Sequence, residues 1–169
     1  HNCSAVYESS ASRASLEYSS NYLSHSISYA STQTARENFA LNVSAFSAKG
    51  ELDRWEYLGS ANNLSGFDLV FGTDYEKTKS NNSSRDNLGV YLEFLSDFSD
   101  NFFLTAGVRH DDNDVGTNAS YRFSGAYLID LSNNATLKIK ASRGTGFRAP
   151  SPFEIDYNAG AFAFPPASL

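Results

Sequence analysis

The strongest constraint on the fold is the alternation of apolar and polar residues in segment 135–142, which reads Ala-Thr-Leu-Lys-Ile-Lys-Ala-Ser. Successive side chains of a β-strand point to opposite faces, so one face of this segment is wholly apolar and the other carries Lys138 and Lys140. A strand of this kind separates an apolar medium from water. That is the property of a wall strand in a membrane β-barrel.

The same period of two recurs along the chain and predicts about nine strands. The predicted ranges are 14–20, 23–35, 38–48, 52–61, 64–79, 86–97, 102–112, 119–131 and 135–142. Several of them run over about 10 to 13 residues, longer than the usual strand of about 5 or 6 and close to what a tilted strand needs to cross a bilayer. We therefore predict an all-β fold, an antiparallel up-and-down transmembrane β-barrel.

Short polar segments separate the predicted strands. Segments 62–63, 99–101 and 132–134 are predicted to be tight turns, whereas 80–85 and 113–118 are predicted to be longer polar connections. Short turns at one end and longer loops at the other are typical of outer-membrane barrels. Tight turns also require each strand from residue 64 onward to pair antiparallel with its sequence neighbour.

Composition narrows the function classes. No run of apolar residues approaches the length of a transmembrane helix or the core of a signal peptide, although aromatic residues make up 14% of the chain. The net charge of −6 argues against a nucleic-acid partner. The single cysteine, Cys3, excludes an internal disulfide and a thiolate metal cage.

No enzyme, cofactor or metal site is predicted. Residues 109–114 include a histidine and three aspartates, but neighbours in a strand point to opposite faces and do not converge on one ion. The sequence has no Gly-x-Ser-x-Gly motif, phosphate loop or paired-histidine motif. The glycines at 144 and 146 precede two prolines rather than the helix that a dinucleotide site requires.

Four motifs in order carry a family resemblance. They are Gly89-Val-Tyr-Leu-Glu93, Thr105-Ala-Gly-Val-Arg-His-Asp-Asp112, Thr117-Asn-Ala-Ser-Tyr-Arg122 and Gly144-Thr-Gly-Phe-Arg-Ala-Pro150. This succession resembles the barrel domain of TonB-dependent outer-membrane receptors, and the resemblance covers residues 64–155 best. It implies that residues 1–169 are part of one β-barrel domain of 22 strands with a plugged lumen. The plug domain and the remaining barrel strands are expected to lie outside this sequence.

The resemblance also implies a function. It is active transport by a receptor in the outer membrane of a Gram-negative bacterium, which takes up a scarce ligand such as an iron-siderophore, haem, cobalamin or a glycan. The implied partners are outer-membrane lipid, the plug domain of the same receptor, TonB acting through that plug, and a small ligand that the sequence leaves open. Because the chain has no Met and no closing strand after its last prolines, we expect it to be part of a longer chain.

Charged residues on the polar faces of the predicted strands form the candidate lumen site. They are Asp68, Asp74, Glu76, Glu93, Arg109, Arg122, Lys138 and Lys140. Charge inside a barrel needs a partner or water, so these residues are expected either to contact the plug or to pair with neighbours on adjacent strands. Segment 143–154 holds two glycines and two prolines, which predict an ordered excursion from the strand ladder. Arg148 and Glu154 in that segment are further candidates for plug contact.

Two other architectures fit parts of the pattern. A complete small barrel of about eight strands, with a structural or adhesive role in the outer membrane, suits a chain of 169 residues. A soluble β-sandwich requires strands of about 5 or 6 residues and a dry interior between two sheets. The lysines and arginines on the polar faces argue against the sandwich.

Overall fold

The computed structural model describes residues 3–62, 64–81, 83–131, 135–152 and 154. Its strands are β1 (Cys3–Ser19), β2 (Leu23–Ala40), β3 (Val43–Ala61), β4 (Phe67–Ser80), β5 (Ser83–Ser99), β6 (Phe102–Asn113), β7 (Gly116–Leu131) and β8 (Ala135–Gly144). They form one antiparallel sheet in sequence order. The described residues contain no helix that is long and apolar enough to cross a membrane. The predicted all-β fold and the antiparallel pairing of sequence neighbours are confirmed.

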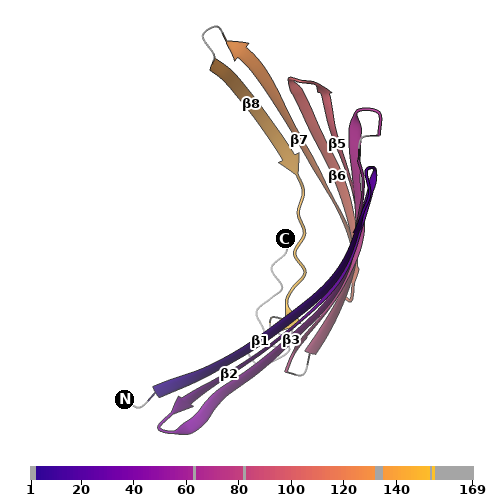
Figure 1. Cartoon of the computed structure of the whole chain (residues 1–169). Helices are drawn as coiled ribbons and strands as arrows, with labels where there is room; N and C mark the ends of the chain where they lie inside the picture. Colours follow the sequence, from indigo (N-terminus) through magenta and orange to yellow (C-terminus); the bar gives the residue numbers. More distant parts are fainter. Residues whose placement is uncertain (1–2, 63, 82, 132–134, 153, 155–169) are drawn as a thin grey trace.

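The sheet curves into an open arc (Figure 1). In the part of the chain that the structure describes, β1 is hydrogen-bonded only to β2 and β8 only to β7. A complete eight-stranded barrel would pair β1 with β8, so the alternative of a complete small barrel is wrong. The sandwich is wrong too, because the strands that the structure describes form a single sheet. Apart from glycines and Pro152, Ala61 is the only apolar residue that is buried among those described.

The first half of the chain forms fewer and longer strands than predicted. The sequence predicts separate strands at 38–48 and 52–61, but the chain turns at Leu41 and Asn42 and then continues as β3, which makes eight described strands rather than nine. Both turn residues have positive φ, 53° and 64°, as a two-residue type I′ turn requires. Neither turn residue is glycine, so the sequence gives little indication of a turn at this place. Gly50 lies inside β3, between the two predicted ranges, where a Cβ would come within 2.9 Å of a threonine hydroxyl on β2.

Two connections also differ from the prediction. The predicted longer loops at 80–85 and 113–118 are each a two-residue connection, and their other residues belong to the ends of long strands. The predicted alternation of short turns with longer loops is therefore wrong at these places. The turn at 99–101 is found between β5 and β6. Residues 132–134 and Asn63, where other tight turns were predicted, lie outside the described residues.

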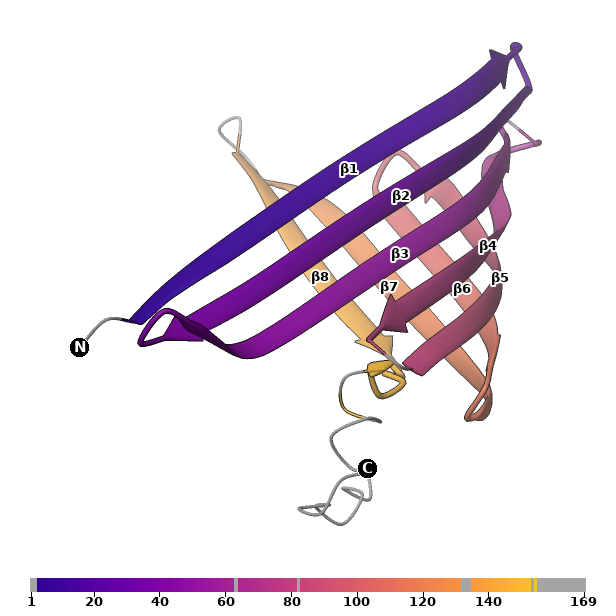
Figure 2. The same cartoon turned by 90° about the horizontal axis from the view of Figure 1, so that it is seen from below.

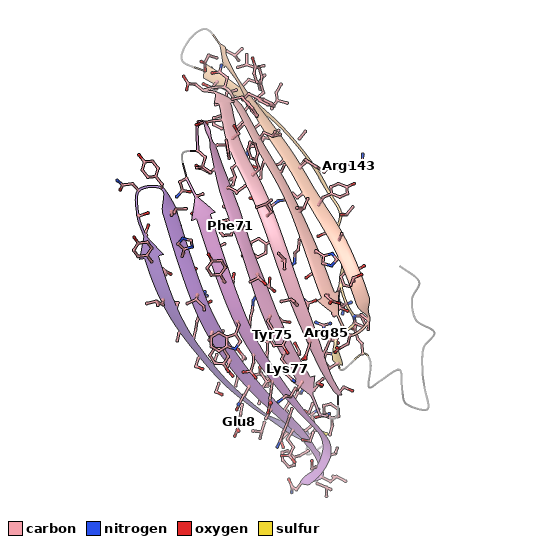
Figure 3. All side chains as sticks on the ribbon, turned by 90° about the vertical axis from the view of Figure 1, so that its right-hand side faces the viewer. Glu8, Phe71, Tyr75, Lys77, Arg85 and Arg143 are labelled. Atoms are coloured by element: carbon pink, nitrogen blue, oxygen red, sulfur yellow. The ribbon has the colours of Figure 1, made fainter. Side chains whose placement is uncertain are left out.

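The strand register sorts the side chains onto two faces, because residues paired across an antiparallel ladder share a face. One row joins Glu93, Gly107 and Arg122, and the adjacent row on the opposite face joins Phe94, Ala106 and Phe123. The predicted separation of Arg122 from Phe123 is confirmed. Phe71 of β4, on the convex face of the arc that Figure 3 shows, shares its face with the apolar row by register, so the charged row lies on the concave face.

The convex face changes from apolar to charged along β4. Phe71, Tyr75 and Lys77 follow one another on this face (Figure 3). Tyr75 is paired with Trp55 of β3, which is paired with Tyr29 of β2, and the Tyr29 and Trp55 ring centroids are 4.7 Å apart. Both tyrosine hydroxyls donate to carboxylates, at 2.8 and 2.9 Å. Such a row of amphipathic rings is typical of the band of aromatic residues at the interface between the apolar core of a membrane and water in a β-barrel.

Beyond this aromatic row the strands carry charge on the convex face as well. Lys79 is 3.2 Å from Glu51, and Lys77 is 3.7 Å from Asp86. Strands β1 to β3 have 17, 18 and 19 residues, whereas about 9 to 11 suffice to cross a bilayer. This end of the sheet therefore projects beyond the apolar layer. We call it the charged end.

Candidate functional site on the concave face

An ion-pair network on the concave face connects β4 with β6. The guanidinium of Arg109 donates hydrogen bonds to both carboxylate oxygens of Asp74, at 2.7 and 3.1 Å, and to Asp111, at 2.7 to 3.0 Å. Asp74 is only 4% exposed, so its charge needs a close partner. Because β5 lies between β4 and β6, the arginine side chain bridges two strand spacings, about 10 Å.

Gly89 of β5 provides the space for this bridge. It is paired with Asp74 on one side and Asp111 on the other, so it lies beneath the Arg109 side chain. A Cβ at this position would be 2.0 Å from Nη2 of Arg109 and 3.0 Å from Oδ1 of Asp74. Asn87 adds a donor, since its amide nitrogen is 3.1 Å from Oδ1 of Asp111. Only glycine lets the guanidinium lie this close to the sheet.

Tyr91 extends the network toward β3. Its ring lies over Gly72 of β4, where a Cβ would be 2.5 Å from the ring carbon Cζ. The Cζ atom of Arg109 is 5.7 Å from the centroid of the same ring, within the range of a cation–π contact. Aromatic and guanidinium groups therefore lie along neighbouring strands because the glycines beneath them leave room.

Arg54 of β3 also belongs to the site, and it is not among the residues predicted from the sequence. Its guanidinium nitrogens are 3.8 Å from Asp74, 3.9 Å from Glu76 and 3.8 Å from Glu56. All three distances exceed hydrogen-bond length, and Nε of Arg54 is buried without a hydrogen-bond partner among the described residues. Ionisable residues in segment 53–56 occupy both odd and even positions. The alternation of polar and apolar residues therefore does not show which face of the sheet Arg54 lies on. The pairing of Arg54 with Glu76 assigns it to the concave face.

A second ion pair lies nearer β7. Arg122 donates to the carboxylate of Glu93 across Gly107, which is paired with both. An open groove of about 430 Å³ runs from this pair to Arg54 and includes Thr145. The concave wall is thus hollowed where its arginines gather.

The structure brings together some of the predicted site residues and separates others. Asp74, Glu76 and Arg109 meet in the first network, and Glu93 and Arg122 meet in the second pair. Asp68 lies on the concave face, toward the end of the sheet opposite the charged end. Lys138 and Lys140 are exposed on the edge strand β8. Among the described residues no group of three or more His, Cys, Asp or Glu side chains could hold a metal ion.

Residues 145–152 and Glu154, which we call the strap, leave the ladder after β8. The excursion was predicted from residue 143, but Arg143 and Gly144 still belong to β8 and pair with β7. The strap runs inside the curve of the sheet (Figure 1). Its first residue, Thr145, still bonds to β7, since its N–H donates to the carbonyl of Tyr121 at 2.9 Å. Arg148 donates to both carboxylate oxygens of Glu154, at 2.6 and 2.8 Å. Its partner is thus a residue of the strap itself, and contact of Arg148 with a plug stays a prediction.

The end of the strap is a helix capping box. The N–H of Glu154 donates to Oγ of Ser151 at 3.2 Å, and the N–H of Ser151 donates to the Glu154 carboxylate at 2.7 Å. Pro152 occupies the first helical position, where its missing donor is harmless. The Ser151 N–H, and then the Arg148 guanidinium, lower the pKa of Glu154 to about 2. The sequence signal for this capping box is Ser-Pro-x-Glu at residues 151–154.

Comparison with known proteins identifies the family. The model of the TonB-dependent receptor-like β-barrel matches residues 4–168. The vitamin B12 transporter BtuB of Photobacterium profundum is 31% identical over 142 residues, which are 79% of this chain and 23% of the transporter. The chain belongs to the TonB-dependent receptor β-barrel family. Receptors of this family reside in the bacterial outer membrane, and they are transporters rather than enzymes.

Two solved receptor structures share the fold. The siderophore receptor PirA of Pseudomonas aeruginosa has a TM-score of 0.69 and 17% identity, over 87% of this chain and 28% of that one. A mutant of the ferric enterobactin receptor PfeA from the same organism has a TM-score of 0.69 and 16% identity, over 88% of this chain and 26% of that one. The chain thus spans 23 to 28% of the length of these relatives. The open eight-stranded arc corresponds to part of their barrels.

Proposed function

We propose that this chain forms part of the barrel wall of an outer-membrane receptor that takes up a scarce ligand with energy relayed by TonB. The observation that carries the proposal is the family match over residues 4–168 on a sheet with two unlike faces. The convex face presents apolar side chains to lipid, and the concave face presents ion pairs to a lumen. Residues 1–169 are one portion of a single barrel domain, and the charged end points away from the cell.

Cobalamin is the first ligand to test. The relative with 31% identity is a vitamin B12 transporter, whereas the two siderophore receptors share the fold at 16 and 17% identity. Iron-siderophores are the second class of ligand to test, and haem and glycans are the third and fourth. The groove that contains Tyr91 and Arg122 offers a phenol and a guanidinium group on the lumen side of the wall.

A plug domain inside the barrel is the partner of the concave face. The candidates for contact with it are Asp68, Asp74, Glu76, Glu93, Arg109, Arg122, Lys138, Lys140, Arg148 and Glu154, to which we add Arg54. Arg109 is held by several short hydrogen bonds within the wall. Arg54 lies 3.8 to 3.9 Å from three carboxylates and makes no short hydrogen bond to any of them. Its guanidinium can therefore donate to a carboxylate of the plug without first breaking a strong bond within the wall. Arg54 is therefore the strongest candidate for plug contact.

Uptake by the complete receptor tests the proposal. Cells that express it, with and without functional TonB, are incubated with radiolabelled cobalamin and, separately, with a labelled ferric siderophore. We expect surface binding in both strains and accumulation only where TonB is active. Binding without TonB-dependent accumulation of any ligand class would contradict the transport function. Accumulation of a siderophore rather than cobalamin would change the ligand and leave the function intact.

A further inference from the structure

Arg143 places a positive charge on the convex face of the edge strand β8. It is paired with Phe123 of β7, which belongs to the apolar row that continues through Ala106 of β6. Paired residues of an antiparallel ladder share a face, so Arg143 starts from the side of the wall that meets lipid. Figure 3, which views that side, shows Arg143 near the edge of the sheet. An arginine on this side is costly unless its charge reaches water or an anion.

Arg143 also differs from the other arginines of the chain in its contacts. Each of the others has a polar or charged partner; they are Arg13, Arg36, Arg54, Arg85, Arg109, Arg122 and Arg148. Arg85, for example, donates to the carbonyl of Pro150 in the strap. Lys77 and Lys79, on the convex face, are paired with carboxylates. Among the described residues none accepts a hydrogen bond from the Arg143 guanidinium or forms an ion pair with it, so its donors are available to another partner.

The apolar part of the convex face ends at a different level on each strand. On β4 and β5 the last large apolar residues before the charged end are Tyr75 and Leu88, which are paired. On β6 and β7 they are Val108 and Tyr121, which are also paired. Leu88 is paired with Asp112 rather than with Val108, so the boundary moves away from the charged end from β5 to β6. The oblique course of the strands, visible in Figure 2, explains this shift, because paired residues of tilted strands lie at different depths.

The same boundary reaches β8 at Arg143. The N–H of Thr145 donates to the carbonyl of Tyr121 at 2.9 Å, so Thr145 lies beside the boundary row of β7. One further step of the shift leads to the preceding residue of the convex face, which is Arg143. Its long side chain can extend from the apolar layer into the layer of lipid head groups. Tyr121 and Phe123, whose ring centroids are 5.6 Å apart, are exposed beside it and offer an apolar surface to acyl chains.

We propose that Arg143 binds a phosphate group of the glycolipid in the outer leaflet, the lipid A part of lipopolysaccharide. A guanidinium presents two parallel N–H donors that match two phosphate oxygens, and phosphate is the anion that this lipid carries where the acyl chains meet the head group. The inference rests on the proposed function only for the orientation of the charged end, away from the cell. It requires neither a transported ligand nor TonB.

Binding of fluorescent lipid A to the complete receptor, purified in an uncharged detergent, tests the site. Three probes are compared: lipid A with both phosphates, lipid A from which the phosphates have been removed, and phosphatidylglycerol. We expect Arg143→Gln to bind phosphorylated lipid A on the order of tenfold more weakly than the parent, the factor for loss of a charged hydrogen bond. Binding of the dephosphorylated probe should be unchanged, and the parent should prefer phosphorylated lipid A to phosphatidylglycerol.

Arg36 provides the matched control. It lies on the concave face of β2, and its Nε donates to Asn38 on its own strand at 3.2 Å. Arg36→Gln should bind lipid A as the parent does, whereas Arg143→Lys, which keeps the charge but loses the paired donors, should bind with intermediate affinity.

Several results would overturn the site. They are an unchanged affinity of Arg143→Gln for phosphorylated lipid A, an equal loss with the dephosphorylated probe or in Arg36→Gln, and equal binding of phosphatidylglycerol by the parent. A lower unfolding midpoint of Arg143→Gln in lipid-free detergent, with lipid A affinity unchanged, would assign the guanidinium to a carboxylate of the barrel instead. If Arg143→Gln fails to fold, Arg143→Lys decides, and an affinity equal to the parent's contradicts the site. Failure of ligand uptake leaves these results readable.

Discussion

Gly89 determines whether Arg109 reaches Asp74, because the guanidinium lies where any Cβ would be. The same device appears on the convex face, where a Cβ on Gly59 would be 2.5 Å from the ring of Phe71. In a single-layer sheet, long side chains pack against neighbouring strands rather than against a second layer. Glycines in the strands therefore mark the positions that large side chains cover.

Gly89→Ala should destabilise the complete receptor by about 1 to 3 kcal/mol, because the added methyl group forces the guanidinium away from its carboxylates. Urea unfolding of the detergent-refolded receptor measures the effect. Gly125→Ala is the control, since a Cβ there would meet its nearest neighbour, a carbonyl oxygen, at an ordinary 3.8 Å. Equal unfolding midpoints for the two variants would show that the bridge over Gly89 is not needed.

Glu154 should titrate with a pKa of about 2, below its ordinary value of 4.5. A carboxylate with a lowered pKa stabilises the folded form above its ordinary pKa, and that contribution is lost as the pH falls through the lowered value. The capping box should therefore stay intact from neutral pH down to about pH 3. Carbon-13 NMR of the Glu-labelled receptor in detergent, assigned with Glu154→Gln, measures the titration. A midpoint near 4.5 would contradict the bonds to Ser151 and Arg148.

At the scale of the element, the alternation of apolar and polar residues predicts a strand and its faces well where lipid lies on one side of the strand and water on the other. Strands β6, β7 and β8 meet that condition, and their predicted starts and faces agree closely with the structure. Strands β1 to β3 extend past the aromatic row with water on both sides, so polar residues occupy both alternating sets. Their boundaries were correspondingly the least accurate, and the turn at 41–42 was missed.

Phe123→Arg should hinder membrane insertion, whereas Ser124→Arg should be tolerated. Phe123 is 50% exposed on the convex face, and an arginine on the lipid side costs about 2 to 4 kcal/mol near the bilayer midplane. Ser124 is on the opposite face, in a row with Thr105 and Ser142. Folding of each complete receptor into liposomes, followed by heat-modifiable mobility on gels, compares them. Equal folding yields would refute the assignment of faces.

At the scale of the whole molecule, the arc is an open sheet that matches part of a larger receptor barrel. Its edge strands β1 and β8 each have one neighbour among the described residues, and unpaired backbone groups in lipid cost several kcal/mol each. The ion pairs on the concave face likewise suit a filled or hydrated lumen rather than a hydrophobic core. Transport is consequently a property to be measured on the complete receptor.

Arg54→Gln in the complete receptor should lower TonB-dependent uptake by roughly two- to fivefold while ligand binding at the cell surface is unchanged, as expected for loss of one partly exposed ion pair with the plug. Arg36→Gln is the control, because it removes a concave-face arginine away from the network. Radiolabelled ligand binding at low temperature and accumulation at growth temperature separate the two steps. Parallel loss of binding and uptake would assign Arg54 to the ligand instead.

The sequence by itself determined the class of fold, the faces of the later strands and most charged residues of the candidate site. Those features depend on contact with lipid or water, which leaves a local period of two in the chain. The tertiary structure alone decided which charges meet. Arg109 reaches Asp74 across a glycine, Arg54 joins through the register of β3 with β4, and the strap returns to Arg85. These contacts connect residues 20 to 65 positions apart, whose distances only the pairing of strands and the curvature of the sheet set.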